Sequence, residues 1–94
     1  MINSRDYEFR WNEWNVGHVA EHGVHPDEAE HVVNFASPPY PEKIGGGKYR
    51  VRGQTPSGRY LQVIYIFSPK GVIFVIHAMP LSPRDKRQYR RRRK

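Results

Sequence analysis

The longest apolar stretch of the chain, residues 59–79, is apolar at odd and even positions alike and rich in β-branched and aromatic side chains. Turn-forming residues interrupt it at Ser68-Pro-Lys-Gly71, so we predict two strands joined by a tight turn. Strands that are apolar on both faces lie inside a sheet and are covered on both sides, at least in part. The polar exceptions in these strands are Arg59, Gln62 and His77.

A short strand and a helix are predicted before this stretch. Apolar residues alternate with charged ones over residues 7–11, as in a strand with one buried face. Asn12 then offers an N-cap oxygen and Gly23 a left-handed C-cap, so we expect a helix that runs to about His22. The buried positions expected in this helix are Trp14, Val19 and Ala20.

A second helix is signalled more strongly. Pro26 suits the first helical position, and Asp27 and Glu28 complement the helix dipole in the first turn. Residues 37–39, with the sequence Ser-Pro-Pro, end the helix. An apolar stripe at i, i+3, i+4 and i+7, which we expect to face the core, consists of Ala29, Val32, Val33 and Ala36.

The remaining elements are a strand, a hairpin connection and a last helix. Residues 40–47 contain three successive glycines and are expected to form a loop, and residues 48–53 alternate as a strand. Residues 54–58 connect this strand to the strand pair, and Ser82 can cap a basic helix that ends at about Arg91. The order of elements predicts an α+β fold. A small antiparallel sheet would pack against two N-terminal helices, with a short C-terminal basic helix and the second face of the sheet partly open.

Length and composition narrow the class of protein. Residues 1–94 are enough for a single domain, in which we expect residues 91–94 to be a frayed basic tail. The chain has no cysteine, which excludes a disulfide framework and a thiolate metal site. No apolar run reaches the roughly 18 residues of a membrane helix, and residues 1–10 do not resemble a signal peptide. We therefore expect a soluble, cytoplasmic protein.

The net charge of +7 is unevenly distributed. Residues 1–42 carry a net charge of −6 and residues 43–83 one of +6, while the rest of the chain holds eight Lys or Arg and one Asp. The chain therefore combines a basic sheet region with a basic tail. Such surfaces bind polyanions, among which nucleic acid is the first expectation.

Three cationic side chains, Lys48, Arg50 and Arg52, occupy alternate positions of one predicted strand and therefore share a face. Arg59 begins the neighbouring strand. Like charges on one face repel one another unless anions or acids lie nearby, and a phosphate would satisfy them. The alternative is a solvated edge strand, on which Lys and Arg discourage aggregation.

His77 interrupts an otherwise apolar strand, and we expect it to share a face with Val75 and Met79. Histidine can act as a general acid or base near neutral pH. The alternative is a core histidine that is hydrogen-bonded to the backbone. The basic stripe on the neighbouring strands favours the functional interpretation.

A second histidine pattern, formed by His18, Glu21 and His22, matches the H-x-x-E-H motif of inverted zinc peptidases. Histidines four residues apart share a helix face, and His25 and His31 follow in the sequence. However, the helix is expected to end directly after this motif, and so small a domain has no distant segment to supply a further ligand. We therefore predict no metal centre and no cofactor, and we keep a histidine-based metal-binding protein as a weaker alternative.

The C-terminal segment offers phosphate contacts through Arg84, Lys86 and Arg87. Such contacts would make nucleic-acid binding steeply dependent on salt. The alternative is a solvated basic helix face. Tyr89 lies within this segment, and we expect it to pack against the domain and anchor the helix.

A series of short motifs runs along nearly the whole chain. Its members are Phe9-Arg-Trp11, His22-Gly-Val24, Glu28-Ala29, Gly53, Gly58-Arg59-Tyr-Leu61, Val63, Tyr65, Ile76-His-Ala78, Ser82, Asp85, Arg87 and Tyr89. In their order and spacing they resemble the BrnT-type toxins. The resemblance implies a RelE-like fold and a cytoplasmic, metal-independent endoribonuclease toxin of a type II toxin–antitoxin pair, which cleaves RNA and inhibits translation. The implied partner is an antitoxin with a ribbon-helix-helix DNA-binding segment, through which the complex would repress its own operon.

Three departures from the family's pattern bear on the chemistry. His77 stands where the family usually has Ser, Met79 where it usually has Arg, and Lys48 where many members have Arg. The loss of an arginine would remove a charge partner of the transition state, worth about 10²-fold in rate if it acted like an oxyanion-hole donor.

The residues and the resemblance together predict a site in which RNA lies across the basic face of the sheet and its 2′-OH attacks the adjacent phosphorus. The residues expected to hold the scissile phosphate or transfer protons are His77, Arg59 and Lys48. The residues expected to bind RNA phosphates are Arg50, Arg52, Arg84, Lys86 and Arg87. The alternative, motivated by Met79, is a non-catalytic relative that binds nucleic acid or a protein partner.

Overall fold

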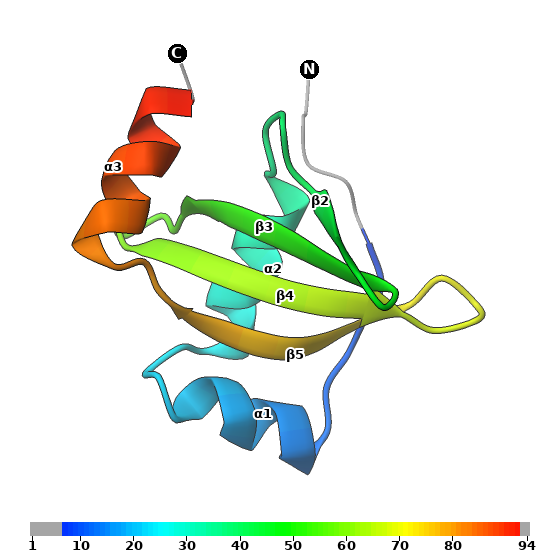
Figure 1. Ribbon diagram of the computed structural model, residues 1–94. Coiled ribbons are helices and arrows are strands. Elements are labelled where there is room, and N and C mark those ends of the chain that lie inside the picture. Colours follow the sequence, from blue (N-terminus) through cyan, green and yellow to red (C-terminus); the bar gives the residue numbers. More distant parts are fainter. Residues whose placement is uncertain (1–6, 93–94) are drawn as a thin grey trace.

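Residues 7–92, the part of the chain that the computed structural model describes, form one five-stranded sheet and three helices (Figure 1). The elements are β1 (Phe9–Arg10), α1 (Glu13–Ala20), α2 (Pro26–Asn34), β2 (Glu42–Gly45), β3 (Lys48–Gln54), β4 (Tyr60–Phe67), β5 (Ile73–Pro80) and α3 (Pro83–Arg92). The strand order is β1-β5-β4-β3-β2. The pairs β2–β3, β3–β4 and β4–β5 are antiparallel, and β1 is parallel to β5. The predicted α+β fold is confirmed, and the sheet is mixed instead of purely antiparallel.

Strand β2 lies where the sequence predicted a loop. Its Lys43 pairs with Tyr49 of β3, and the chain reverses through glycines with positive φ, including Gly46 at 63° and Gly47 at 75°. Glycine adopts these angles without steric cost, which explains the run of glycines as the turn of a hairpin. Strand β3 is therefore an internal strand, flanked by β2 and β4.

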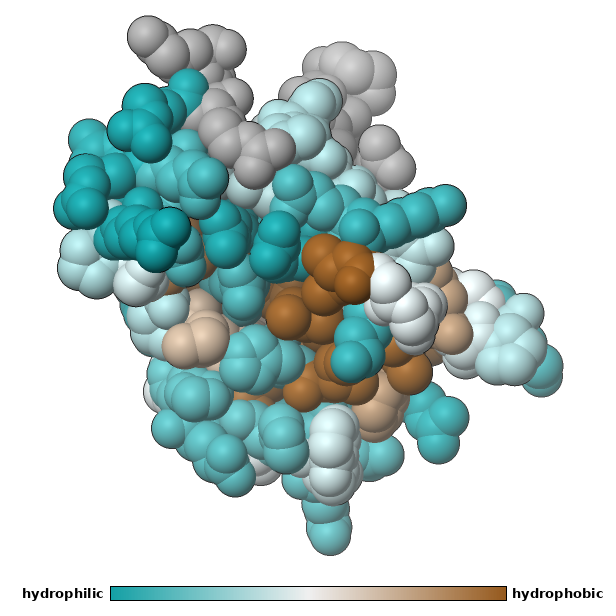
Figure 2. Space-filling view, in the orientation of Figure 1, coloured by the Kyte–Doolittle hydropathy of each residue, from teal (hydrophilic) through white to brown (hydrophobic). Residues whose placement is uncertain are grey.

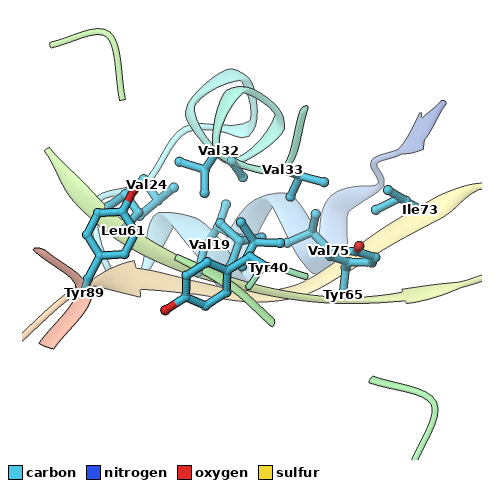
Figure 3. Packing of buried hydrophobic residues seen from close by; sticks show 14 residues of the cluster. Val19, Val24, Val32, Val33, Tyr40, Leu61, Tyr65, Ile73, Val75 and Tyr89 are labelled. Atoms are coloured by element: carbon cyan, nitrogen blue, oxygen red, sulfur yellow. The ribbon is translucent and has the colours of Figure 1, made fainter. Parts of the chain in front are cut away.

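The core lies between one face of the sheet and α2, which packs on β3 and β4, while α1 lies along β5 (Figure 1). Figure 3 shows Val32 and Val33 on the α2 side of the buried cluster and Leu61 and Tyr65 on the sheet side. The predicted stripe of α2 is confirmed for its three helical positions, which are buried. A Cβ on Gly53 of β3 would lie 3.2 Å from Cγ1 of Val32, so a glycine there permits this close approach of the helix.

Helix α1 begins at the predicted cap but buries other residues than expected. Asn12 and Asn15 form a reciprocal capping box, and the helix ends at Ala20, before His22. Trp14 is 51% exposed and Ala20 is exposed, so the expected buried positions are wrong except for Val19. Asn15 is buried instead, because its amide is satisfied by Asn12 and by the carbonyl of Arg10.

A β-bulge in β5 changes which residues share a face. Tyr65 of β4 pairs with Val75, but the preceding Ile64 pairs with His77, so Ile76 is an extra residue in β5. Val75 is completely buried on the helix side, whereas His77 lies on the opposite face. The expectation that His77 and Val75 share a face is therefore wrong. The expectation that His77 and Met79 share a face is confirmed, because Met79 follows His77 by two residues and the bulge precedes both.

The buried ring of Tyr89 helps to hold helix α3 against the domain. The hydroxyl of Ser82 accepts a hydrogen bond from the backbone N–H of Asp85 at 3.1 Å, as the predicted cap requires. Tyr89 is 5% exposed and contacts the rings of Tyr40 and Tyr60, which confirms its predicted packing role. The helix continues to Arg92, so part of the expected frayed tail is helical, and residues 93–94 lie outside the described part. None of the helices within residues 7–92 is long and apolar enough to cross a membrane.

Candidate functional site

The face of the sheet turned away from α2, here called the open face, carries three rows of side chains across three strands. The register places Lys48, Ile66 and Phe74 in one row, Arg50, Ile64 and His77 in the next, and Arg52, Gln62 and Met79 in the third. Figure 2 shows apolar side chains gathered over the middle of the molecule on this side, with hydrophilic ones around them. The open face thus combines an apolar centre with a basic margin on β3 and a histidine on β5.

The three basic residues of β3 share the open face as predicted, but they have different surroundings. Nε and Nη2 of Arg50 donate to one carboxylate oxygen of Glu42, at 3.1 and 2.9 Å. Arg52 is 9% exposed, and its Nε donates to Gln62 at 2.9 Å. Lys48 is exposed to solvent. Because β3 is internal to the sheet, the alternative of a solvated edge strand does not hold.

Arg52 also connects the open face to the basic helix. Its Nη2 lies 3.7 Å from a carboxylate oxygen of Asp85, in the first turn of α3. Lys86 places its ammonium 5.0 Å from the ring centroid of Tyr60, and Arg84 and Arg87 are exposed. The cationic side chains of α3 therefore lie beside the Arg52 end of the open face, where Figure 1 shows α3 next to the ends of β3 and β4.

Arg59 does not join the open face. Its Nη1 donates to both carboxylate oxygens of Glu28 in α2, at 3.0 Å each, and to the carbonyl of Gly23 at 3.0 Å. Two residues before Leu61, Arg59 has the same phase as that core residue and points to the helix side. The expectation that Arg59 and the basic residues of β3 form one site is therefore wrong, and the ion pair ties the start of β4 to α2.

His77 lies beside two histidines from α1 and the turn that follows it, which the sequence indicated as candidate metal ligands. The rings of His22 and His77 are in edge-on contact, with centroids 5.5 Å apart. Burial lowers the pKa of His77 below its usual value, and the positive charges of His22 and His18 lower this pKa further. His77 is therefore a neutral imidazole near neutral pH, with a ring nitrogen free of a proton.

The other aromatic side chains of α1 continue this contact along β5. His18 stacks on Trp14 with centroids 4.3 Å apart, and Trp14 stacks on Phe74 of the open face at 5.9 Å. Spacing by four residues indicated that His18 and His22 share a helix face, but no sequence signal indicated that this face meets β5. Within the described residues, no group of three or more His, Asp or Glu side chains could hold a metal ion.

Two hollows on the surface differ in whether the predicted site residues lie near them. One of about 70 Å³ lies on the open face, lined by Gln62, Met79 and Asp85 among others. A larger one of about 620 Å³ lies between β1 and the β4–β5 turn, where Arg10 and Lys70 contribute to its lining, and it includes none of the predicted site residues. We therefore place the candidate site on the open face, despite the larger volume elsewhere.

The chemistry of the open face follows from its middle row. Arg50 and His77 are separated by Ile64 alone, or about 10 Å across two strand spacings. A guanidinium can stabilise an anion and a neutral imidazole can accept a proton from a group bound between them.

No known protein family, curated protein or solved structure matches this chain.

Proposed function

We propose that this chain is a cytoplasmic, metal-independent endoribonuclease toxin of the BrnT type, with a RelE-like fold, which inhibits translation by cleaving RNA. The motifs spread along the sequence support this assignment. The observation that carries the proposal is the middle row of the open face, where Arg50 and His77 lie on either side of Ile64. This row offers a phosphate-binding group and a proton acceptor on one accessible surface.

In this proposal RNA lies across the open face. Lys48 and Arg50 bind its phosphates, and Arg84, Lys86 and Arg87 of α3 extend the backbone contacts beyond the sheet. His77 accepts the proton of the 2′-OH as its oxygen attacks the adjacent phosphorus. Arg59 takes no part, because it is bound to Glu28 on the other side of the sheet.

The family's usual arginine is replaced by Met79, and the third row of the open face offers a substitute for its charge. Arg52, Gln62 and Met79 occupy one row, and Arg52 donates to Gln62. A guanidinium therefore remains in the row from which the arginine is missing. Its burial and its carboxylate neighbour Asp85 limit it to a supporting role.

The proposed partner is an antitoxin with a ribbon-helix-helix DNA-binding segment. The toxin would reach operator DNA only through this antitoxin, and the complex would repress its own operon. The basis for this partner is the resemblance to the BrnT-type toxins.

A second candidate function is a non-catalytic relative that binds a protein partner or nucleic acid. The observation that favours it is the apolar centre of the open face, where Ile64, Ile66 and Phe74 are only half-buried. An apolar surface within a polar rim is typical of a protein-binding site. Met79 adds to this apolar centre at the position of the family's arginine.

Induced expression with an RNA read-out distinguishes the two candidates. For the toxin we expect growth arrest, and we expect the purified protein to cleave RNA in the presence of EDTA. His77→Ala should lower the cleavage rate by about 10²- to 10⁴-fold, the usual contribution of a general base. Tight, salt-sensitive RNA binding without cleavage would favour a nucleic-acid-binding form of the second candidate. Neither binding nor cleavage of RNA would exclude the toxin and leave only the protein-binding form.

A matched pair of lysines tests which face binds RNA. Lys48 lies on the open face, and Lys43 of β2 pairs with Tyr49 and so lies on the opposite face of the same hairpin. Lys48→Ala should weaken RNA binding and reduce the slope of log K against log salt by about 0.7, the loss of one phosphate contact on single-stranded RNA. Lys43→Ala removes the same charge and should leave the slope unchanged. Equal slopes for the two variants would show that RNA does not bind the open face.

A further inference from the structure

The contact between His22 and His77 joins two parts of the chain that are far apart in the sequence. His22 lies in the turn that follows α1, and His77 lies on β5 at the margin of the open face. Their rings meet edge-on with centroids 5.5 Å apart and an interplanar angle of 67°. His22 is exposed to solvent and His77 is half-buried, so solvent reaches both imidazoles.

We propose that His22 and His77 form an imidazole pair that carries out general acid–base catalysis of phosphodiester cleavage, with His77 as the base and His22 as the acid. The inference rests on the proposed ribonuclease function and adds a catalytic residue from a second element. Cleavage by the 2′-OH needs two proton transfers, one from the attacking oxygen and one to the leaving oxygen. In-line displacement places these two oxygens on opposite sides of phosphorus, so two separate groups serve the reaction better than one.

A catalytic group must lie within about 2.6–3.2 Å of the oxygen that it serves. Rings whose centroids are 5.5 Å apart and whose planes are strongly inclined can direct their nitrogens to different atoms of one phosphodiester. Arg50 lies across Ile64 from His77 and donates to Glu42 of β2, so in this proposal it exchanges that carboxylate for a non-bridging oxygen of the phosphate.

The step balances without another reactant. A bond forms between the 2′ oxygen and phosphorus while the bond from phosphorus to the 5′ oxygen breaks. His77 gains the proton of the 2′-OH, and protonated His22 gives its proton to the 5′ oxygen. The products are a 2′,3′-cyclic phosphate and a 5′-hydroxyl, and exchange with water restores the two imidazoles. The step consumes no water, metal ion or cofactor.

The surroundings determine which imidazole is the base. Burial first, and then the charges of His22 and His18 on the α1 side, lower the pKa of His77 and so disfavour its protonated form. Arg50 lies across Ile64 in the same row and is paired with Glu42. We therefore assign His77 as the base and the more exposed His22 as the acid.

The test measures cleavage of total cellular RNA by the purified full-length protein in EDTA, between pH 5 and pH 8. The wild-type rate should follow a bell-shaped curve. It should fall at low pH, the acid limb, where the base His77 becomes protonated, and at high pH, the alkaline limb, where the acid His22 loses its proton. His22→Gln should lower the rate by about 10²- to 10⁴-fold and abolish the alkaline limb, whereas His77→Gln should abolish the acid limb. His31→Gln is the control, because His31 stacks on Phe35 of α2 and should leave rate and profile unchanged.

A modified substrate separates a catalytic role from a structural one. RNA with sulfur in place of the 5′ oxygen, at a site mapped with the wild-type protein, has a leaving group that needs no proton. His22→Gln should cleave this substrate at nearly the wild-type rate, while His77→Gln should remain slow. A His22→Gln protein that is equally impaired on both substrates would be damaged structurally and would overturn the pair.

The failure of this inference is distinguishable from the failure of the proposed function. If the wild-type protein cleaves RNA and His22→Gln retains its rate and both limbs, the imidazole pair is wrong and the ribonuclease stands. If the wild-type protein leaves RNA intact over the whole pH range, both proposals are wrong. Circular dichroism of each variant establishes that it is folded.

Discussion

Strand β4 carries apolar side chains on both of its faces, but the two faces have different environments. On the helix side Leu61, Val63 and Tyr65 are at most 1% exposed. On the open face Ile64 and Ile66 are equally apolar but remain half-buried. The difference is α2, which covers the first face, whereas basic side chains and α1 only flank the second. An apolar position in a central strand thus predicts burial only if an element is available to cover it.

A comparison of two arginines extends this lesson to charge. Arg50 of β3 and Arg59, just before β4, each bind a glutamate, Glu42 and Glu28 respectively. Arg50 points to the open face, in the same row as His77, but Arg59 is held against α2 on the helix side. Their phase relative to the buried residues of the strand decides which one belongs to a surface and which one holds the fold together.

The largest effect that tests the difference between the faces is on stability. Leu61→Ala should lower the free energy of unfolding by about 2–5 kcal/mol, because it removes a fully buried side chain and leaves a cavity. Ile66→Ala removes a similar volume from the open face and should cost clearly less, since solvent already reaches this side chain. Urea denaturation of both variants measures the two costs.

Equal losses for Leu61→Ala and Ile66→Ala would contradict the description of an uncovered face. Such a result would mean that the open face is covered in solution, for example by a second copy of the chain. A dependence of the unfolding midpoint on protein concentration would identify that case.

Much of the fold could be predicted from local patterns, and the errors have identifiable physical causes. The caps at Asn12, Pro26 and Ser82 were recognised because capping depends on a few neighbouring residues. Strand β2 was missed because its glycines suggested a loop, although only Gly46 and Gly47 form the turn and Gly45 ends the strand. The bulge at Ile76 was missed because an inserted residue leaves no change in hydrophobicity.

The candidate site shows the same limit at the level of tertiary structure. The shared face of Lys48 and Arg50 follows from period two alone, and the sequence predicted it. The phase of Arg59 relative to Leu61 could have been derived in the same way and excludes it from that face. The contact of His22 with His77 depends on how α1 lies against β5, which no local pattern specifies.

A smaller effect tests the comparison of the two arginines. Arg59→Ala should lower the free energy of unfolding by about 1 kcal/mol or less, because the guanidinium is 36% exposed and screened by solvent. It should leave RNA binding unchanged. Arg50→Ala should instead weaken RNA binding and reduce its salt dependence, since it removes a cation from the open face. Unfolding and binding measurements on both variants sharpen the comparison, and a loss of RNA binding in Arg59→Ala alone would reverse it.

The smallest effect expected is a pH dependence that originates on the open face. The pKa of His77 is lowered in the folded protein from 6.5, through burial first and then through the charges of His22 and His18. As the pH falls through 6.5 the unfolded chain therefore binds a proton that the folded chain does not yet accept. The free energy of unfolding falls with pH in this window and levels off below the lowered pKa. Stability measured in urea at pH 7.5 and 5.5 should decrease less in His77→Gln than in the wild type, and identical decreases would show that the open face does not disfavour a charged imidazole.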